Sequence, residues 1–152
     1  MQYDILNRYT EAVQCTAEID CADDAPRSIK IGLAVRWGVS AKADLSGADL
    51  SGAPVIPEIH RAVYAAASQP GALDMGRWHC GTTHCRAGWV VTIAGQDGFD
   101  LEAKIGTPAA AMAIYMASDP DRWKTERLPD FYCGNATALA DMKRMAVGGW
   151  ND

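Results

Sequence analysis

The chain has 152 residues, of which 49% are hydrophobic and 22% are charged, a composition typical of one globular domain or of two small units that share a core. Its net charge of -5 opposes nonspecific binding to nucleic acid, so a nucleic-acid duplex is not an expected partner. No apolar run approaches membrane-spanning length and residues 1–10 lack a signal-peptide pattern, so we expect a cytoplasmic protein without a membrane partner. The five cysteines are odd in number and sparse, which indicates reduced thiols.

The first part of the chain predicts one strand and one helix. Apolar and polar residues alternate over Tyr9–Ile19, a pattern typical of a strand with one buried face. A helix start follows at residues 23–26, where Asp residues precede a Pro. The apolar stripe of this helix consists of Ile29, Leu33 and Trp37, and the helix is expected to fade over residues 38–40.

A repeat comes next. Residues 43–47 and 48–52 both read Ala-Asp-Leu-Ser-Gly, and residues 53–57 form a degraded third unit. A strict five-residue period predicts a repeat architecture in which Ala and Leu point inward and the other positions face water. These units resemble the pentapeptide repeat, whose family forms a right-handed quadrilateral β-helix with one repeat on each side. The resemblance implies a β-helix fragment of less than one coil, which would pack against the rest of the chain.

The remainder of the chain predicts four to five short helices. One is expected after Pro57, one after residues 82–83 and one in the segment that ends at Gly106. The last two begin at Thr107-Pro108 and at the expected cap Asn135. Residues 119–134 are expected to form a long polar loop whose acidic side chains are surface groups, and His60 is expected to be solvated. We therefore predict an α+β fold, with the strand, helix and repeat in residues 1–57 and a helical domain in residues 58–152.

Chemically active side chains are concentrated between Trp78 and Trp89. This segment reads Trp-His-Cys-Gly-Thr-Thr-His-Cys-Arg-Ala-Gly-Trp and holds two of the three His and two of the five Cys. Thr82 and Thr83 are favoured N-cap residues, so a buried helix is predicted to begin here, with Cys85, Trp89 and Ile93 on its apolar stripe. Backbone N–H groups at such a helix start attract anions and lower the pKa of a nearby thiol.

Over nearly its whole length the chain resembles a set of pentapeptide-repeat proteins encoded by bacteriophages and prophages. The resemblance rests on the two repeats, on residues 80–89, which read Cys-Gly-Thr-Thr-His-Cys-Arg-Ala-Gly-Trp, and on Asn-Ala-Thr-Ala-Leu at residues 135–139. It implies a viral protein that works in the cytoplasm of a host cell, with its function in the helical part or at the junction with the repeats.

Two chemical interpretations of the central motif stay open as alternatives. Zinc could be held by His79, Cys80, His84 and Cys85, but no Cys-x-x-Cys knuckle is present and Cys133 is distant in sequence, so we predict no metal and no cofactor. A Cys/His hydrolase or phosphodiesterase would use Cys85 or Cys80 as nucleophile, a histidine as base and Arg86 to hold an oxyanion or phosphate. The expected role is nevertheless non-enzymatic.

Ligand binding without chemistry is the favoured function. An aromatic face, hydroxyl groups, a helix start and one cation would meet at Trp78, His79, Thr82, Thr83, His84 and Arg86. Such a site predicts a phage accessory protein that sequesters a small anionic, nucleotide-like defence signal or blocks a host factor, and so serves host takeover.

A purely structural motif is the remaining alternative. In it Thr83 caps the helix, Cys85 and Trp89 fill the core, Gly88 lets another helix approach and Arg86 is solvated. The protein would then bind a host protein through an exposed apolar patch, for which Trp123, Phe131 and Trp150 are candidates. A homo-oligomer is a further open alternative.

Overall fold

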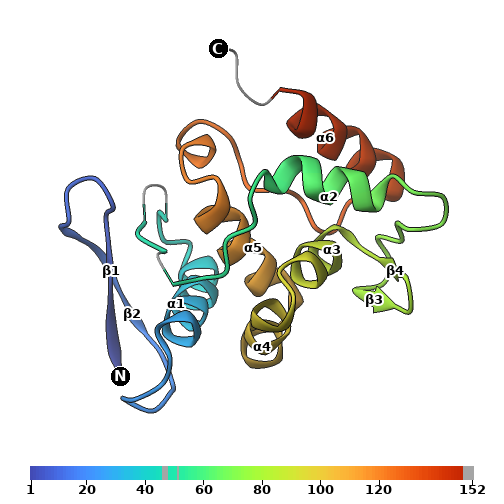
Figure 1. Cartoon of the computed structure of the whole chain (residues 1–152). Helices are drawn as coiled ribbons and strands as arrows, with labels where there is room; N and C mark the ends of the chain where they lie inside the picture. The colour runs from blue at the N-terminus through green and yellow to red at the C-terminus, as the bar shows by residue number, and fades with distance from the viewer. Residues whose placement is uncertain (46–47, 51, 149–152) are drawn as a thin grey trace.

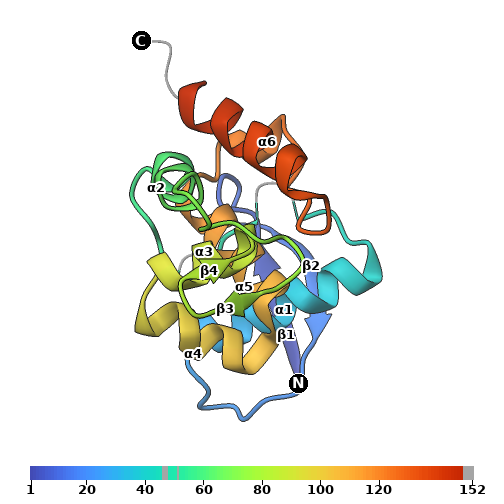
Figure 2. The ribbon, with the colours of Figure 1, turned by 90° about the vertical axis from the view of Figure 1, so that its right-hand side faces the viewer.

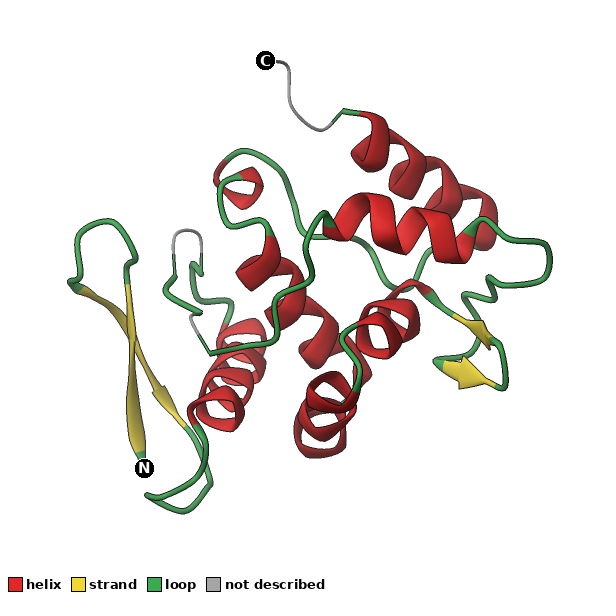
Figure 3. Cartoon of the chain, viewed as in Figure 1, coloured by secondary structure: helices red, strands yellow, loops and turns green. Residues whose placement is uncertain are grey.

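The computed structural model describes residues 1–45, 48–50 and 52–148, and these residues form a mixed α+β protein. They contain six α-helices and two small antiparallel sheets of two strands each (Figures 1 and 3). None of the described helices is long and apolar enough to span a membrane. The α+β class is therefore confirmed at this level.

The N-terminal sheet is a hairpin of β1 (Gln2–Leu6) and β2 (Val13–Glu18). The expected strand over Tyr9–Ile19 is wrong in its first half, because residues 7–12 form the turn, in which the backbone N–H of Asn7 donates to Ala12 O at 2.8 Å. The partner strand β1 was not anticipated. The expected buried face is confirmed at Ala17 and Ile19, whereas Tyr9 and Val13 are exposed.

Helix α1 (Arg27–Ala41) begins directly after Pro26, as expected, and extends slightly beyond its expected end. It packs against α4 (Gln96–Ile105) and α5 (Thr107–Ser118). Gly32 leaves room for the close approach of α1 to α4, because a Cβ at this position would lie 2.5 Å from Ile105 Cδ1 and 2.8 Å from Leu101 Cδ1. Helix α1 is thus packed closely against α4 and α5.

The described residues of the repeat segment follow α1 and contain two backbone hydrogen bonds with a five-residue spacing. The backbone N–H of Ala48 donates to Leu45 O at 3.0 Å, and five residues later Ala53 N–H donates to Leu50 O at 3.1 Å. Gly52 has φ +106°, a conformation that glycine adopts more readily than other residues. The expected inward positions are confirmed at Ala48, Leu50 and Ala53, which are buried, whereas Ala43 and Leu45 are half-buried and Val55, at the Leu position of the third unit, is 62% exposed.

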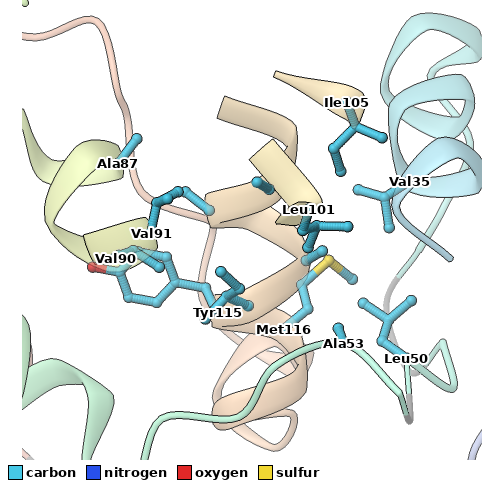
Figure 4. Packing of buried hydrophobic residues seen from close by; sticks show 14 of the residues in the cluster. Val35, Leu50, Ala53, Ala87, Val90, Val91, Leu101, Ile105, Tyr115 and Met116 are labelled. Atoms are coloured by element: carbon cyan, nitrogen blue, oxygen red, sulfur yellow. The ribbon is translucent and has the colours of Figure 1, made fainter. Parts of the chain in front are cut away.

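No closed β-helix coil is found in the described part of this segment, and residues 46, 47 and 51 of the repeat lie outside it. The segment instead contacts the N-terminal hairpin, where Ala48 forms an isolated bridge with Asn7 and Asp49 N–H donates to Leu6 O at 2.6 Å. Its buried side chains face α5, as Figure 4 shows for Leu50 and Ala53 near Met116.

Five α-helices lie within residues 58–148, which agrees with the expected four to five: α2 (Ile59–Ala67), α3 (Arg86–Ile93), α4, α5 and α6 (Asn135–Val147). A short 3-10 helix, Arg122–Lys124, interrupts the expected polar loop. Helix α2 lies alongside α6 at one end of the molecule in both ribbon views (Figures 1 and 2).

Helix α5 is the centre of the core. Its Ala110, Ala111, Ala113, Ile114 and Tyr115 have no exposed surface, and it contacts α1, α3 and α4. Small Ala side chains let these helices approach closely. Figure 4 shows Tyr115 on the α3 side of α5, next to Val90 and Val91. One buried cluster includes residues from both sides of position 57, and the division of the chain there stays a prediction.

Candidate functional site

The central motif forms a β-hairpin followed by a helix, not a helix start at the threonines. Strand β3 (His79–Cys80) pairs with β4 (Thr83–His84), so Gly81-Thr82 is a two-residue turn. Gly81 has φ +62°, which suits the first central position of a type II′ turn. The expected caps Thr82 and Thr83 are therefore wrong, and the N-cap of α3 is Cys85, whose Sγ accepts from Gly88 N–H at 3.3 Å.

The hairpin is attached to the core at several points. The Thr83 hydroxyl donates to Gly71 O at 2.8 Å, and the Trp89 indole N–H donates to Ala72 O at 2.8 Å. Gly88 makes room for the backbone of Trp78 and not for a neighbouring helix, since a Cβ at Gly88 would lie 1.9 Å from Trp78 O. The hairpin is thus fixed directly against the first turn of α3.

His79, His84 and Glu102 form a hydrogen-bonded row that we call the histidine relay. His79 Nε2 lies 2.8 Å from Glu102 Oε1, and His79 Nδ1 lies 2.8 Å from His84 Nδ1. The Thr107 hydroxyl donates to the same oxygen of Glu102 at 2.5 Å. An ionised carboxylate only accepts, so with neutral rings His79 donates through Nε2 and His84 donates through Nδ1.

The ring of His84 is enclosed by aromatic neighbours. Its centroid lies 4.6 Å from Trp89 and 4.9 Å from His79, both edge-on. Burial and, secondly, the charge of His79 lower the pKa of His84. Both effects favour the neutral ring of His84.

The thiol of Cys85 is not activated. Cys85 has no exposed surface, and burial raises the pKa of its thiol, with backbone N–H groups opposing this change. The expected lowering of its pKa is therefore wrong. Cys80 is exposed, and Arg77 Nη1 donates to its Sγ at 3.6 Å. In the described part of the chain no histidine hydrogen-bonds either thiol, and no group of three or more His, Cys, Asp or Glu could hold a metal ion.

Arg86 turns away from the hairpin and into the core, where it is 1% exposed. It donates through Nε to the Tyr115 hydroxyl at 3.1 Å and through Nη1 to Asp141 Oδ2 at 2.5 Å. Burial acts to lower its pKa, but Tyr115 and Asp141 more than offset this, so the pKa is raised. Arg86 is neither solvated nor part of one site with Trp78, Thr82 and the relay.

Arg86 is one end of a row of alternating charges that we call the charge network. Asp141 also accepts from Arg144 at 2.9 Å, and Arg144 donates to Glu126 at 3.1 Å. The row runs through Arg86, Asp141, Arg144, Glu126, Arg122, Asp119 and His60. It joins α3, α6, the segment after α5, and α2.

His60 closes the charge network and is not a solvated surface residue. Its side chain is 10% exposed, and its Nε2 lies 2.9 Å from Asp119 Oδ2. The ring packs 5.7 Å from both Tyr115 and Trp123, which leaves Nδ1 buried without a hydrogen-bond partner. Burial lowers the pKa of His60, although the hydrogen bond to Asp119 opposes this shift.

A cavity of about 660 Å³ opens beside the charge network, and we call it the α6 cavity. Its lining consists of Arg86, Glu126, Arg127, Leu128, Pro129, Asp130, Cys133, Thr137, Asp141 and Arg144. Four of these six charged side chains belong to the charge network, and the other two, Arg127 and Asp130, form no ion pair with any described residue. Burial raises the pKa of the Cys133 thiol, which gives the cavity no activated nucleophile.

An exposed aromatic pair adjoins the cavity in the chain. Tyr132, between the lining residues Asp130 and Cys133, is 76% exposed and packs edge-on against Trp78, with the ring centroids 5.8 Å apart. The apolar patch expected of Trp123 and Phe131 is wrong, because these side chains are 7% and 4% exposed. Trp150, the third expected member, lies outside the described residues.

Sequence reasoning missed Arg127, Asp130 and Tyr132. The available signal was weak, since they lie in a polar segment where an isolated aromatic or charged residue is ordinary. Asn135 also differs from expectation: it is the first residue of α6, after the N-cap Gly134, and its side chain accepts from Met75 N–H at 2.7 Å.

The fold and the site thus define a mixed α+β protein with a charged, partly apolar cavity at its C-terminal helix. Comparison with protein-family models, with curated proteins and with solved structures gives no match to this chain.

Proposed function

We propose that the protein acts by binding, and that it holds a small anionic, nucleotide-like ligand in the α6 cavity. The observation that carries the proposal is the exposed guanidinium of Arg127, which forms no ion pair with any described residue, on the wall of a cavity of about 660 Å³. This volume lies in the range of ordinary small-molecule sites, about 300–1,000 Å³. An Arg without a protein carboxylate is available for bidentate hydrogen bonding to a phosphate or carboxylate.

The surroundings of Arg127 support a ligand with a flat ring. Leu128 and Pro129 give the cavity an apolar wall, and Tyr132, which packs against Trp78, lies between the lining residues Asp130 and Cys133 in the chain. Aromatic side chains stack on nucleobases whatever their sequence, as in single-strand binding sites. Of the binding residues expected from sequence, Arg86 lines the cavity, whereas Trp78 is not among its lining residues.

Catalysis by the motif is not proposed. A cysteine hydrolase needs a thiolate within hydrogen-bond reach of a base, and the thiol of Cys85 is buried with a raised pKa. The histidines instead pair with Glu102, Asp119 and each other.

The resemblance to phage-encoded pentapeptide-repeat proteins extends the proposal. We propose that the protein works in the cytoplasm of a host cell, where it sequesters a defence signal or blocks a host factor. The repeat segment would be a β-helix fragment that serves as a connector, which is supported by the backbone hydrogen bond that recurs after five residues. Homo-oligomerisation stays a separate alternative.

Native mass spectrometry of the full chain purified from bacterial cells tests the binding proposal. We expect an additional mass of nucleotide size on the wild-type chain and its loss in Arg127→Gln. Lys143→Gln is the matched control, because it removes one exposed cation from α6 without touching the cavity lining. A bare wild-type chain, together with no binding of added nucleoside monophosphates, would contradict the proposal, as would an undiminished adduct in Arg127→Gln.

A further inference from the structure

We infer that the α6 cavity selects a guanine nucleotide with one phosphate group, and that Asp130 is the residue that reads the base. This inference rests on the proposed function and specifies its ligand. It follows from the two charges of the cavity that the charge network leaves over, Arg127 and Asp130.

The carboxylate of Asp130 receives no hydrogen bond from a described side chain. Its Oδ1 accepts from the backbone N–H of Tyr132 at 2.8 Å, and no described cation forms an ion pair with it. An ionised carboxylate has about four lone-pair positions and donates nothing. The carboxylate of Asp130 is therefore complementary to a neutral ligand edge with adjacent donors.

Guanine is the common nucleobase with such an edge. Its N1–H and its N2 amine lie next to each other and match the two oxygens of one carboxylate. Adenine and cytosine place a ring-nitrogen acceptor beside their amine, and uracil places one N–H between two carbonyl oxygens, so each would set a lone pair against the carboxylate. A carboxylate at this place favours guanine through donors and disfavours the other bases through repulsion.

The hydrogen bond from the backbone N–H of Tyr132 to Asp130 connects the residue proposed to recognise the base with an aromatic residue that could stack on it. The N–H that holds the Asp130 carboxylate belongs to Tyr132, whose ring is 76% exposed. The carboxylate is thus fixed to the backbone of the residue that carries the exposed ring. A base that stacks on Tyr132 would bring its edge near Asp130.

The charges of the cavity limit the number of phosphates. Arg86 and Arg144 are neutralised by Asp141 and Glu126, and these two carboxylates line the cavity themselves. Arg127 is left to bind one phosphate. Each additional phosphate would lie near carboxylates without a further free cation, and like charges repel at such distances.

Isothermal titration calorimetry of the full chain with GMP, IMP, AMP and GTP tests this inference. IMP differs from GMP only in lacking the N2 amine. We expect GMP to bind about tenfold or more tightly than IMP and AMP, the effect of one hydrogen bond to a charged group, and GTP to bind no more tightly than GMP. Asp130→Asn should weaken GMP binding by about tenfold and reduce the preference over AMP, with its folding checked by thermal melting.

Two variants separate base reading from anion binding. Arg127→Gln should weaken all four nucleotides by a similar factor, whereas Lys143→Gln should leave them unchanged. Equal binding of GMP, IMP and AMP that is insensitive to Asp130→Asn would overturn the inference and leave the binding function intact. A GTP affinity more than tenfold above that of GMP would overturn the single-phosphate part, and binding of none of the four by the wild-type chain would remove both proposals.

Discussion

The histidine relay contains His84 and the α6 cavity is lined by Arg86, which is two residues further along the chain. The two regions differ in whether their polar side chains have partners within the protein. In the relay both nitrogens of His79 are hydrogen-bonded, and one oxygen of Glu102 has two donors. In the cavity, Arg127 and Asp130 have no ionic partner among the described residues. Reactive residue types gathered in a sequence can therefore mark a structural cluster whose polar groups pair with one another, while the side chains without ionic partners lie elsewhere.

Arg86→Leu gives the largest expected change, because it removes the buried end of the charge network. It would leave the Tyr115 hydroxyl buried without its partner and Asp141 without its shortest ion pair. Breaking a buried pair costs about 3–5 kcal/mol, and since the Asp141 side chain is 33% exposed, we expect about 3 kcal/mol in the free energy of unfolding. Urea unfolding measures it.

The control for Arg86 is Arg61→Leu, which removes an exposed pair with Glu58 and should cost no more than about 0.5 kcal/mol. A loss below about 1 kcal/mol for Arg86→Leu would show that the charge network does not stabilise the fold.

Gly88→Ala tests the close packing of the Trp78 backbone, next to the hairpin, against the first turn of α3. The new methyl group would meet the backbone of Trp78, which cannot rotate away as a flexible side chain can. We expect about 1–3 kcal/mol of destabilisation by urea unfolding. Gly134→Ala is the control, because nothing lies within 4 Å of a Cβ at that position, and its cost should be the smaller of the two.

The sequence predicted these elements unequally. Helices α1, α2 and α5 were predicted well because Pro26, Pro57 and Thr107-Pro108 mark their starts and apolar stripes follow. The hairpin was missed because Thr82 and Thr83 suit both an N-cap and a short strand, and only the pairing of His79 with His84 decides between them. Local propensity carries no information about that contact.

The residues of the proposed binding site were missed for a different reason. Arg86 was expected to bind a ligand, but its partners Tyr115 and Asp141 lie 29 and 55 residues away in the chain, so its burial could not be foreseen. Whether Arg127 or Asp130 is left unpaired depends on which carboxylates and arginines meet in three dimensions. A single sequence does not state these long-range pairings.

Glu102→Gln separates the relay from the cavity. The amide keeps the size of the side chain but removes the charge that holds His79, and we expect a loss of about 1 kcal/mol in the free energy of unfolding. GMP binding should not change, because Glu102 does not line the α6 cavity. Lys104→Gln, on an exposed position of the same helix, is the control. Altered GMP affinity in Glu102→Gln would mean that the two regions are coupled.

Acidification should destabilise the protein through His60 and His84. Burial lowers the pKa of both below the ordinary value of 6.5, so in acid the unfolded chain binds protons that the folded chain does not. Their contribution to stability is complete above pH of about 6.5 and is lost as the pH falls from there toward the folded-state pKa values. Urea unfolding between pH 7.5 and 5.5 measures this slope, and His60→Asn should make it shallower; an unchanged slope would argue against a neutral buried His60.

Thiol labelling gives the smallest expected change, since it reports access and not stability. Iodoacetamide at neutral pH should alkylate the exposed Cys80 in the folded protein and leave Cys85 unmodified, as peptide mass spectrometry would show. Labelling in urea should modify both and serves as the control. Rapid reaction of Cys85 in the native state would restore a nucleophilic role for the motif.

Two backbone hydrogen bonds five residues apart in the repeat segment set a rule for changes in chain length. Contact with the N-terminal hairpin is made at Ala48 and Asp49, and the hydrogen bond from Ala48 N–H to Leu45 O recurs five residues later, from Ala53 N–H to Leu50 O. Insertion of a whole five-residue unit after Ala53 would repeat the inward Ala and Leu positions and keep the earlier contacts. An insertion of two or three residues would turn polar positions toward the core, so length variation at this place should be tolerated in steps of five.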